Sequence, residues 1–359
     1  MKKAISTMIC AGFILSLIAC VGSAAPVAVP DKNDKNKKEA AQEKIIIPKE
    51  VKTAMEAGLA ARQPVKTDIP FTISETVVMP GPQQVIYVYF LLKVKNADLG
   101  YALPAAPIVA DPTAAVPPAK LQAKGHVFVQ FYKLENGNAG PLVKELYIPA
   151  ALESDATGYD PEAMDWYSFG YPLPPGNYLA AIALTSNDLT KSGIQYYEFS
   201  LPDPAGFTEK LETSTILCMK EFRQVEAPEA KIGFHRGLLS WSVARITPNL
   251  TKTIKVGDAL DLFFFIYGAR PNDAGKFDIQ IDFEVVQGDK AQIKFAPGQF
   301  QSPLVSLPLP MTQSLEIRTG DKVENKQQDL AAGSYVLIVK MLDNVSGLKG
   351  EKKIEFVVE

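Results

Sequence analysis

Cysteine is scarce in this chain, which has three cysteines among its 359 residues. Cys10 and Cys20 lie in the N-terminal leader, so Cys218 is left alone once the leader is removed or Cys20 is acylated. A single free cysteine excludes an intramolecular disulfide and a metal cluster held by several thiolates. No basic residue or histidine is adjacent to Cys218 in the sequence to lower its pKa, and we expect a buried, unreactive thiol.

Histidine is also scarce, with two residues, and common catalytic motifs are missing. His126 is expected to open a strand, and His235 is expected in a turn. The chain contains no H-E-x-x-H helix, no G-x-S-x-G nucleophile and no Walker-type glycine loop. We therefore predict no catalytic residue, no metal ligand and no cofactor, and a protein that is not an enzyme. Two carboxylates from distant loops could still meet, and this alternative stays open.

The N-terminus has the pattern of a signal peptide. Two lysines precede an uncharged apolar stretch that ends at Ala19 and is too short for a membrane span. Leu17–Cys20 resembles the lipobox of bacterial lipoproteins, in which the signal is cut before a cysteine that is then acylated. We favour a signal peptide over residues 1–20 and a membrane anchor on Cys20. Ordinary cleavage after Ala24, followed by secretion, is the alternative.

A hydrophilic tether and a short helix are expected next. Residues 21–50 hold interleaved acids and lysines and no aromatic residue, so we expect them to be disordered. Residues 51–64 predict a short amphipathic helix that packs on the first folded domain. Without the two leader lysines the chain keeps 35 basic and 40 acidic residues. This mild acidity argues against a nucleic-acid partner, and we expect an exported protein of the cell envelope, periplasmic or at the outer membrane.

The second half of the chain repeats a unit of the first half. Residues 173–201 align with residues 330–358 without a gap, and seven of the 29 positions are identical. Chance pairing would give about two identities. Each copy has an extended segment after a glycine, a polar stretch and a second extended segment, which predicts a β-hairpin. A repeat of this length is a supersecondary unit, so we predict two related domains.

Both copies begin with the pattern L-x-x-G-x-Y, which looks like the tyrosine corner of immunoglobulin-like and fibronectin-type sandwiches. In such a corner the tyrosine hydroxyl bonds to the backbone a few residues upstream and fixes the crossing between two sheets. Ordinary half-buried strand tyrosines are the alternative. The corner residues, structural in either case, are Leu173, Gly176, Tyr178, Leu330, Gly333 and Tyr335.

The segments upstream of each hairpin also have strand character. Val85–Val94 and Leu260–Tyr267 are apolar runs rich in aromatic and β-branched residues, as central strands are. Val127–Tyr132 and Ile279–Glu284 alternate with a period of two, and we align them at their first residues. We therefore predict an all-β fold of two tandem immunoglobulin-like antiparallel β-sandwich domains. Their predicted bounds are residues 65–204 and 205–359.

Two segments are candidate binding regions. Residues 97–125 hold five prolines where the other half has a short loop, and we expect a surface loop there. Asp155–Tyr171 mixes carboxylates with aromatic residues, as sugar-binding surfaces do, although its acids lack the spacing of a calcium loop. Trp166 and Tyr167 are the possible binding residues in it. Burial of their rings in the core is the alternative that we prefer.

Three blocks of the chain resemble the β-sandwich portions of exported bacterial proteins that carry GWxTD-type domains. These blocks are residues 211–217, 254–268 and 330–358. The GWxTD motif itself is absent, so the resemblance implies the scaffold and no activity. We predict a non-catalytic binding or assembly module that recognises a protein or a glycan in the cell envelope. A structural spacer without a specific ligand is the alternative, and a hydrolase with a carboxylate site is a third hypothesis.

Overall fold

The computed structural model describes residues 47–81, 85–104, 120–319 and 322–359. Within these ranges the chain forms strands, one α-helix, α1 (Lys49–Leu59), and two 3₁₀ turns, η3 (Asn96–Leu99) and η4 (Pro204–Gly206). The strands pair antiparallel, apart from a short parallel pair between β13 (Thr253–Ile254) and β22 (Lys349–Val358). The predicted all-β class is confirmed.

Two of the N-terminal predictions concern residues that the structure does not describe. The signal peptide and Cys20 lie outside the described residues, as does nearly all of the tether. Among the helices of the described ranges, none has the length and hydrophobicity that crossing a membrane requires.

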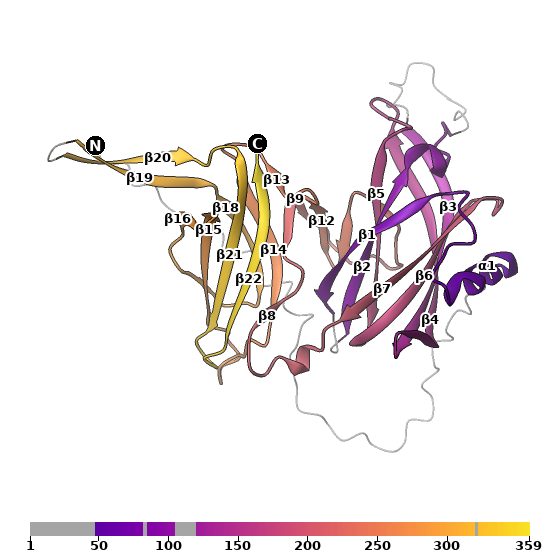
Figure 1. Cartoon of the computed structure of the whole chain (residues 1–359), viewed down its shortest axis with the longest axis horizontal. Coiled ribbons are helices and arrows are strands. Elements are labelled where there is room, and N and C mark those ends of the chain that lie inside the picture. The colour runs from indigo at the N-terminus through magenta and orange to yellow at the C-terminus, as the bar shows by residue number, and fades with distance from the viewer. Residues whose placement is uncertain (1–46, 82–84, 105–119, 320–321) are drawn as a thin grey trace.

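The N-terminal half of the chain forms two facing sheets (Figure 1). Sheet I has the strand order β1-β2-β5, and sheet II has the order β4-β3-β6-β7. The bounds of these strands are β1 (Phe71–Pro80), β2 (Ile86–Lys95), β3 (Lys120–Glu135), β4 (Asn138–Asp155), β5 (Met164–Leu173), β6 (Gly176–Ser186) and β7 (Ser192–Leu201). Inward side chains of both sheets, including Phe90, Val129 and Tyr178, share one hydrophobic core. This half is therefore a β-sandwich.

The C-terminal half forms a second sandwich from sheets III and IV. Sheet III has the order β11-β12-β9-β14-β18, with β8 beside β14, and sheet IV has the order β13-β22-β21-β15-β16, with β17 beside β15. Leu262, Val339 and Phe356 lie in the core between them. The remaining bounds are β8 (Glu212–Thr213), β9 (Leu217–Gln224), β11 (Leu239–Trp241), β12 (Ala244–Pro248), β14 (Ala259–Tyr267), β15 (Ile279–Gln287), β16 (Lys290–Lys294), β17 (Gly298–Phe300), β18 (Leu304–Pro310) and β21 (Gly333–Asp343).

Three strands of the C-terminal half lie outside this sandwich. The short strand β10 (His235–Arg236) pairs with β5 and so adds to the edge of sheet I. Strands β19 (Thr312–Thr319) and β20 (Lys322–Asp329) form a separate antiparallel hairpin.

The repeated segments fold into hairpins of identical register. In β6–β7, Gly176 pairs with Leu201. In β21–β22, the corresponding pair is Gly333 and Val358. The gapless alignment of the two sequence copies thus corresponds to the same backbone pairing in each sandwich.

Both corner tyrosines make the same hydrogen bond to the backbone. The Tyr178 hydroxyl donates to the Pro174 carbonyl, and the Tyr335 hydroxyl donates to the Ala331 carbonyl, each at 2.8 Å. Both rings are buried, and each stacks on the phenylalanine opposite it in the hairpin, with ring centroids 5.5 Å and 5.7 Å apart. The bond spans four residues in each copy, as in a tyrosine corner.

The correspondence between β3 and β15 is shifted by two residues from the predicted alignment. Val127 pairs with Leu184, and Ile281 pairs with Met341. Leu184 and Met341 occupy the same place in the repeat, so Val127 corresponds to Ile281 and not to Ile279. A shift of two leaves the alternation of faces unchanged, which is why the sequence pattern did not reveal it.

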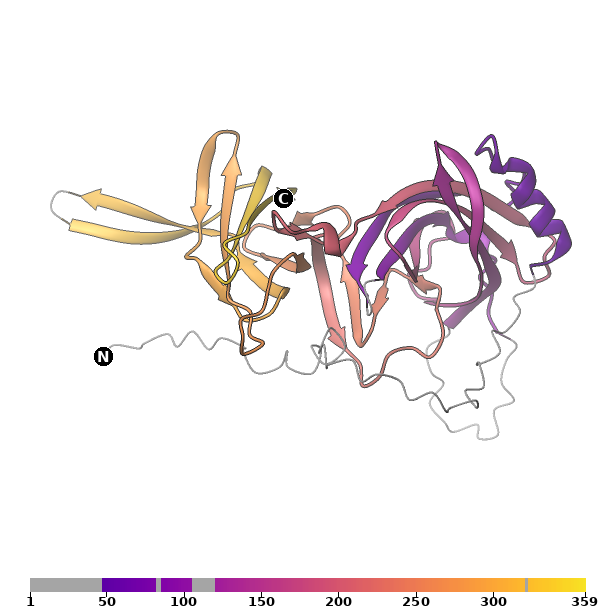
Figure 2. The same ribbon diagram turned by 90° about the horizontal axis from the view of Figure 1, so that it is seen from below.

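Sheets I and III pack against each other and join the two sandwiches. Met79 and Leu91 from the outer face of sheet I share a buried cluster with Trp241 and Phe263 of sheet III. The four sheets are thus layered in the order II, I, III, IV, and Figure 2 shows the two halves side by side. Strand β2 is buried along most of its length because both of its faces are covered.

Helix α1 covers the outer face of sheet II. Its Met55 side chain is fully buried against β6, where Ala181 and Ala183 leave room for the helix. The helix ends at Leu59, so it is shorter than the predicted range of residues 51–64. The packing explains why an 11-residue helix is formed: its apolar stripe is covered by a sheet.

Candidate functional site

Strand β5 carries the two residues that were candidates for binding. Tyr167 is fully buried, its hydroxyl donates to Asn96 Oδ1 at 2.9 Å, and its ring stacks on Phe234. Trp166 is half-buried beside the cluster between sheets I and III. Tyr167 therefore presents no ring face to a sugar and occupies the core position preferred from the sequence, whereas Trp166 is not fully buried.

The connection from β9 to β12 reaches across to the N-terminal sandwich. We call residues 225–243 the clasp, and its two ends meet where the Val225 N–H donates to the Val243 carbonyl at 2.9 Å. Within the clasp, β10 pairs with β5, so His235 lies in a strand and not in the predicted turn. His126 likewise lies within β3 and does not open it. Sequence alone could not show the pairing of β10, because its partner β5 is remote along the chain.

Hydrogen bonds and one aromatic ring attach the clasp to the N-terminal sandwich. The Tyr89 hydroxyl donates to the Ser240 carbonyl at 2.7 Å, and Trp241 Nε1 donates to the Pro80 carbonyl at 3.0 Å. The Phe234 ring belongs to the core of the N-terminal sandwich. The C-terminal half therefore contributes a buried side chain to the core of its neighbour.

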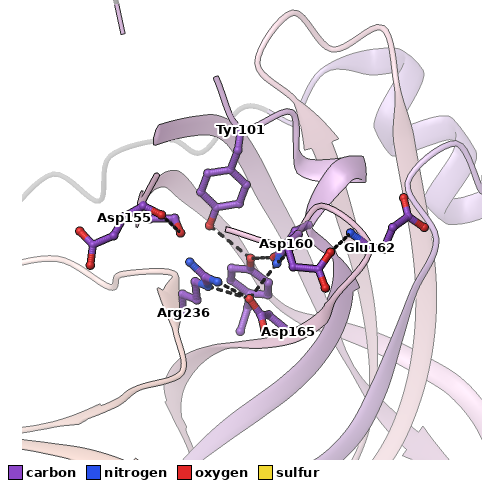
Figure 3. Close-up of polar contacts among 9 residues, drawn as sticks. Tyr101, Asp155, Asp160, Glu162, Asp165 and Arg236 are labelled. Carbon is purple, nitrogen blue, oxygen red and sulfur yellow. Dashed lines mark hydrogen bonds and ion pairs between the residues drawn. The ribbon is translucent and has the colours of Figure 1, made fainter. Parts of the chain in front are cut away.

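A polar network holds one side of β10 (Figure 3). Arg236 forms an ion pair with Asp165, with Nε 2.9 Å from Oδ2. The same oxygen accepts a hydrogen bond from Asn96 Nδ2 at 2.9 Å. The Tyr101 and Tyr167 hydroxyls lie 3.2 Å apart at the end of the network. Burial, and then the bond to Tyr101, raise the pKa of Tyr167 far above its usual value, so its hydroxyl stays protonated as a hydrogen-bond donor.

The acidic residues around this network are engaged locally. Asp160 Oδ1 accepts a hydrogen bond from the Glu162 N–H at 2.9 Å, and the Glu162 carboxylate pairs with Lys95 at 2.6 Å. Asp155 and Arg236 line a polar pocket of about 410 Å³. Among the described residues, no group of three or more histidine, cysteine or acidic side chains is placed to hold a metal ion. The network fixes the clasp against β5.

A second pocket, of about 300 Å³, lies between sheet I and the clasp. We call it the junction pocket. Tyr87 and Tyr171 line it from sheet I, and Glu229 and His235 line it from the clasp. Successive side chains of a strand point to opposite sides, so His235 faces this pocket while Arg236 faces the polar pocket.

Gly170 shapes the sheet side of the junction pocket. A Cβ atom at this position would lie 2.2 Å from Cε1 of Tyr89, so the tyrosine ring rests directly on the glycine backbone. The rings of Tyr87 and Tyr89 stack with centroids 6.2 Å apart and an interplanar angle of 20°. The absence of a side chain on β5 thus lets two tyrosines of β2 lie flat along the pocket.

Charged groups form the clasp side of the junction pocket. One oxygen of Glu229 lies 3.0 Å from His235 Nε2, and the other lies 3.2 Å from the Arg245 guanidinium. The Arg245 side chain is largely buried, with 11% of its surface exposed. The carboxylate is therefore fixed in place and balanced by a positive charge.

The hairpin β19–β20 is inserted next to the second tyrosine corner. In the N-terminal sandwich β5 runs directly into its corner at Leu173, whereas residues 311–329 separate β18 from Leu330. Among the described strands, β19 and β20 pair only with each other. Figures 1 and 2 show the hairpin extending away from sheets III and IV.

Comparisons with known proteins give little help. No family model matches the chain, and no curated protein matches it. Among solved structures, it is similar to the crystal structure of a mutant Salmonella alpha-2-macroglobulin, with 9% sequence identity and a TM-score of 0.15. The match covers 82% of this chain and 17% of that chain, so this chain spans less than a fifth of the macroglobulin. A likeness of this size establishes neither fold nor function.

The clasp and the junction pocket were not predicted from the sequence. One signal was available: the connection between β1 and β2 is residues 81–85, whereas the matching connection between β9 and β14 is residues 225–258. The difference in length identifies an insertion. It does not identify its contacts, because Asp165 and Tyr89 lie far from the clasp in the sequence.

Proposed function

We propose that this protein is a non-catalytic assembly module of the cell envelope that binds a protein partner through the hairpin β19–β20. The observation that supports this function is a two-stranded ribbon that pairs with no third strand in the described part of the chain. A two-stranded ribbon is marginally stable in water. A partner strand added to its edge would supply backbone hydrogen bonds that the ribbon lacks.

The position of the hairpin favours a role in docking over a role in folding. At its base the Leu330 N–H donates to the Met311 carbonyl at 2.9 Å, and Thr312 Oγ1 donates to Asp329 Oδ1 at 2.9 Å. The core of the C-terminal sandwich is thus closed below the hairpin. Residues 312–329 include three aliphatic residues, so we expect main-chain hydrogen bonds and not apolar burial to dominate binding.

Photo-crosslinking in cells that produce the full chain tests this function. A photoreactive amino acid would replace Ser314 or Gln328, which are exposed at the two edges of the hairpin base. Leu189, 40% exposed in the loop between β6 and β7, is the matched control position. We expect one discrete protein adduct from both hairpin positions and none from Leu189. The same adducts from all three positions, or none from the hairpin, would contradict the proposal.

A deletion then tests whether the captured protein needs the hairpin. Replacing residues 312–329 by Gly-Gly joins Met311 to Leu330, whose backbones are already hydrogen-bonded. We expect the deleted protein to fold and to lose binding to the purified partner. Binding that survives the deletion would assign the partner to another surface.

A structural spacer is the second candidate function. It is supported by the buried cluster between sheets I and III, which joins the two sandwiches into an elongated stack. A spacer needs no partner on the hairpin. The absence of any hairpin-specific adduct in the crosslinking experiment would therefore favour this candidate.

We also propose that the chain is exported and carries a lipid on Cys20. The apolar leader and the lipobox-like Leu17–Cys20 support this location. Labelling cells with a palmitate analogue tests it in wild type, Cys20→Ala and the matched control Cys10→Ala. We expect the wild type and Cys10→Ala to carry the label and Cys20→Ala to carry none. Label that persists in Cys20→Ala would exclude lipidation at this residue and favour cleavage after Ala24.

A further inference from the structure

We propose that the junction pocket binds one pyranose ring of a neutral glycan. This site goes beyond the proposed docking role of the hairpin, because it lies between sheet I and the clasp and involves different residues. Four features of the pocket support this ligand: its size, its aromatic surface, its acceptor groups and the contacts that hold the clasp.

The size of the pocket limits the ligand. Its volume of about 300 Å³ is at the small end of ligand pockets, which span roughly 300–1,000 Å³. A single sugar ring fits this space, and a longer glycan would extend from it into solvent. The pocket also lies at the junction of two folded units, where ligand sites are frequent.

The sheet side of the pocket offers flat aromatic surface. Tyr87 is half-buried and lines the pocket, and Pro172 lies opposite it in the strand pairing. The ring of Tyr171 stacks on Phe131 in the core of the N-terminal sandwich, so Tyr87 provides the aromatic surface. The C–H face of a pyranose is apolar and packs well on an aromatic ring, while its edge carries hydroxyl groups. A tyrosine presents both an apolar face and a polar hydroxyl to such a ligand.

The clasp side offers hydrogen-bond acceptors and hydroxyl groups. Glu229 uses one oxygen for His235 and the other for Arg245, and a carboxylate has about four acceptor sites, so lone pairs remain. His235 Nε2 lies 3.0 Å from the Glu229 carboxylate, so Nδ1 is the ring nitrogen that remains for a ligand. Ser240 and Ser242 also line the pocket. Each hydroxyl group of a sugar can donate and accept a hydrogen bond. The sugar can therefore donate to the carboxylate and exchange hydrogen bonds with the serine hydroxyls of the pocket.

Charge favours a neutral ligand over an ionic one. Arg245 balances Glu229, so a cationic ligand would compete with a guanidinium that is already in place. An anionic ligand would be repelled by the Glu229 carboxylate and attracted by Lys231, which also lines the pocket, so the pocket favours neither sign of charge. A neutral sugar neither competes with Arg245 nor is repelled by Glu229.

The pocket is held open by the clasp before any ligand arrives. The Arg236–Asp165 pair (Figure 3), the Trp241–Pro80 bond and the Tyr89–Ser240 bond fix the clasp to sheet I. A preformed site loses little conformational entropy on binding. For a ligand the size of one sugar we expect a dissociation constant on the order of 1–10 mM.

Saturation-transfer NMR on the full chain tests the proposal, with the methyl glycosides of glucose, galactose and N-acetylglucosamine as probes. We expect transfer to the ring protons of at least one probe. Tyr87→Ala should weaken binding about tenfold by removing the stacking surface, and Glu229→Gln should weaken it by removing charge-assisted acceptors. Tyr147→Ala, which removes a tyrosine that is 44% exposed on β4, is the matched control and should bind like wild type.

Several outcomes would overturn the proposal. The proposal is wrong if none of the three methyl glycosides shows saturation transfer. It is also wrong if Tyr87→Ala and Glu229→Gln bind the probes as the wild type does. Binding of a proline-rich peptide to the pocket in place of every sugar would assign a different ligand class. Circular dichroism of each variant distinguishes loss of binding from loss of fold. If Tyr87→Ala unfolds, Glu229→Gln still tests the site, because Glu229 lies on the solvent-facing rim. Deletion of residues 312–329 should leave sugar binding unchanged.

Discussion

The two corner tyrosines differ in one neighbouring side chain. Lys133 Nζ donates to the Tyr178 hydroxyl at 2.9 Å and lies 4.1 Å from the centre of its ring. The Tyr335 hydroxyl bonds to the Ala331 carbonyl. Tyr178 therefore has a charged donor in addition to the backbone bond, and the two repeats should respond differently to the same substitution.

Removing each hydroxyl measures this difference. Tyr335→Phe should lower the free energy of unfolding by about 1 kcal/mol, the usual contribution of a neutral hydrogen bond. Tyr178→Phe should lower it by roughly 2 kcal/mol, because a charged partner also loses its acceptor. Urea unfolding followed by circular dichroism provides the values, with Tyr147→Phe, which removes an exposed hydrogen bond to His126, as the control. If Tyr178→Phe and Tyr335→Phe lower the free energy of unfolding equally, the bond from Lys133 does not stabilise the protein.

Cys218 should make stability depend on pH in the alkaline range. Burial raises the pKa of its thiol from about 9 to about 11. Below pH 9 the thiol is neutral in both states, and its contribution to stability is fully present. Between pH 9 and 11 the unfolded chain ionises first, so the free energy of unfolding falls by roughly 2 kcal/mol.

The matched comparison is wild type against Cys218→Ala at pH 7.5 and pH 10.5. We expect the wild type to lose more stability than the variant over this interval, since the tyrosines titrate in both proteins. A thiol reagent at pH 8 should modify Cys218 only after unfolding. Rapid modification of the folded protein, or parallel pH profiles, would contradict the burial of this thiol.

At the residue scale, some predictions from near neighbours agreed with the structure, whereas those for His126 and His235 did not. The corner tyrosines and Cys218 belong to local patterns, and their environments follow from those patterns. Tyr167 was ambiguous because its neighbours are both acidic and aromatic. Its burial depends on Phe234, a residue of the clasp that no local pattern places there.

At the scale of elements, helix α1 shows how packing can reverse a local preference. Gly58 lies inside the helix, where alanine would ordinarily be favoured by about 1 kcal/mol. A Cβ at this position, however, would lie 2.2 Å from the Gln63 carbonyl oxygen and 2.5 Å from the Tyr196 hydroxyl. The helix can approach β7 this closely only with glycine at that point.

Gly58→Ala is therefore expected to destabilise the protein, by about 1–3 kcal/mol. Thr53→Ala, at an exposed position of the same helix, should be neutral or slightly stabilising. Chemical denaturation of both variants provides the comparison. Stabilisation by Gly58→Ala would mean that the helix does not pack on sheet II as described.

The elements that the sequence revealed are those whose partners are close along the chain. The hairpins β6–β7 and β21–β22 were evident from the repeat, and α1 from its apolar stripe. The clasp and the β3–β15 correspondence were not, because strand pairing over long separations leaves no local trace and a shift of two preserves alternation. The junction pocket arises from the clasp, so it was equally hidden.

At the scale of the whole molecule, the two sandwiches share buried surface. Trp241 and Phe263 lie in the cluster that joins sheets I and III, with ring centroids 5.7 Å apart. Tyr267 and Phe234, both from the C-terminal half, belong to the core of the N-terminal sandwich. Unfolding one half would expose side chains of the other, so we expect the halves to unfold together.

Trp241→Ala should weaken both halves at once. The substitution removes a large buried side chain and the bond to the Pro80 carbonyl, and we expect a loss of about 3–5 kcal/mol. Hydrogen exchange read out by mass spectrometry should show lower protection in β2 of one sandwich and in β14 of the other. Reduced protection confined to the C-terminal half would indicate that the halves are independent.

Calorimetry of the wild-type protein tests most directly whether the four stacked sheets form one cooperative unit. A single unit predicts one thermal transition, with a calorimetric enthalpy equal to the van't Hoff enthalpy. Two resolved transitions, or a calorimetric enthalpy about twice the van't Hoff value, would show that the sandwiches unfold separately and would contradict the joined structure described here.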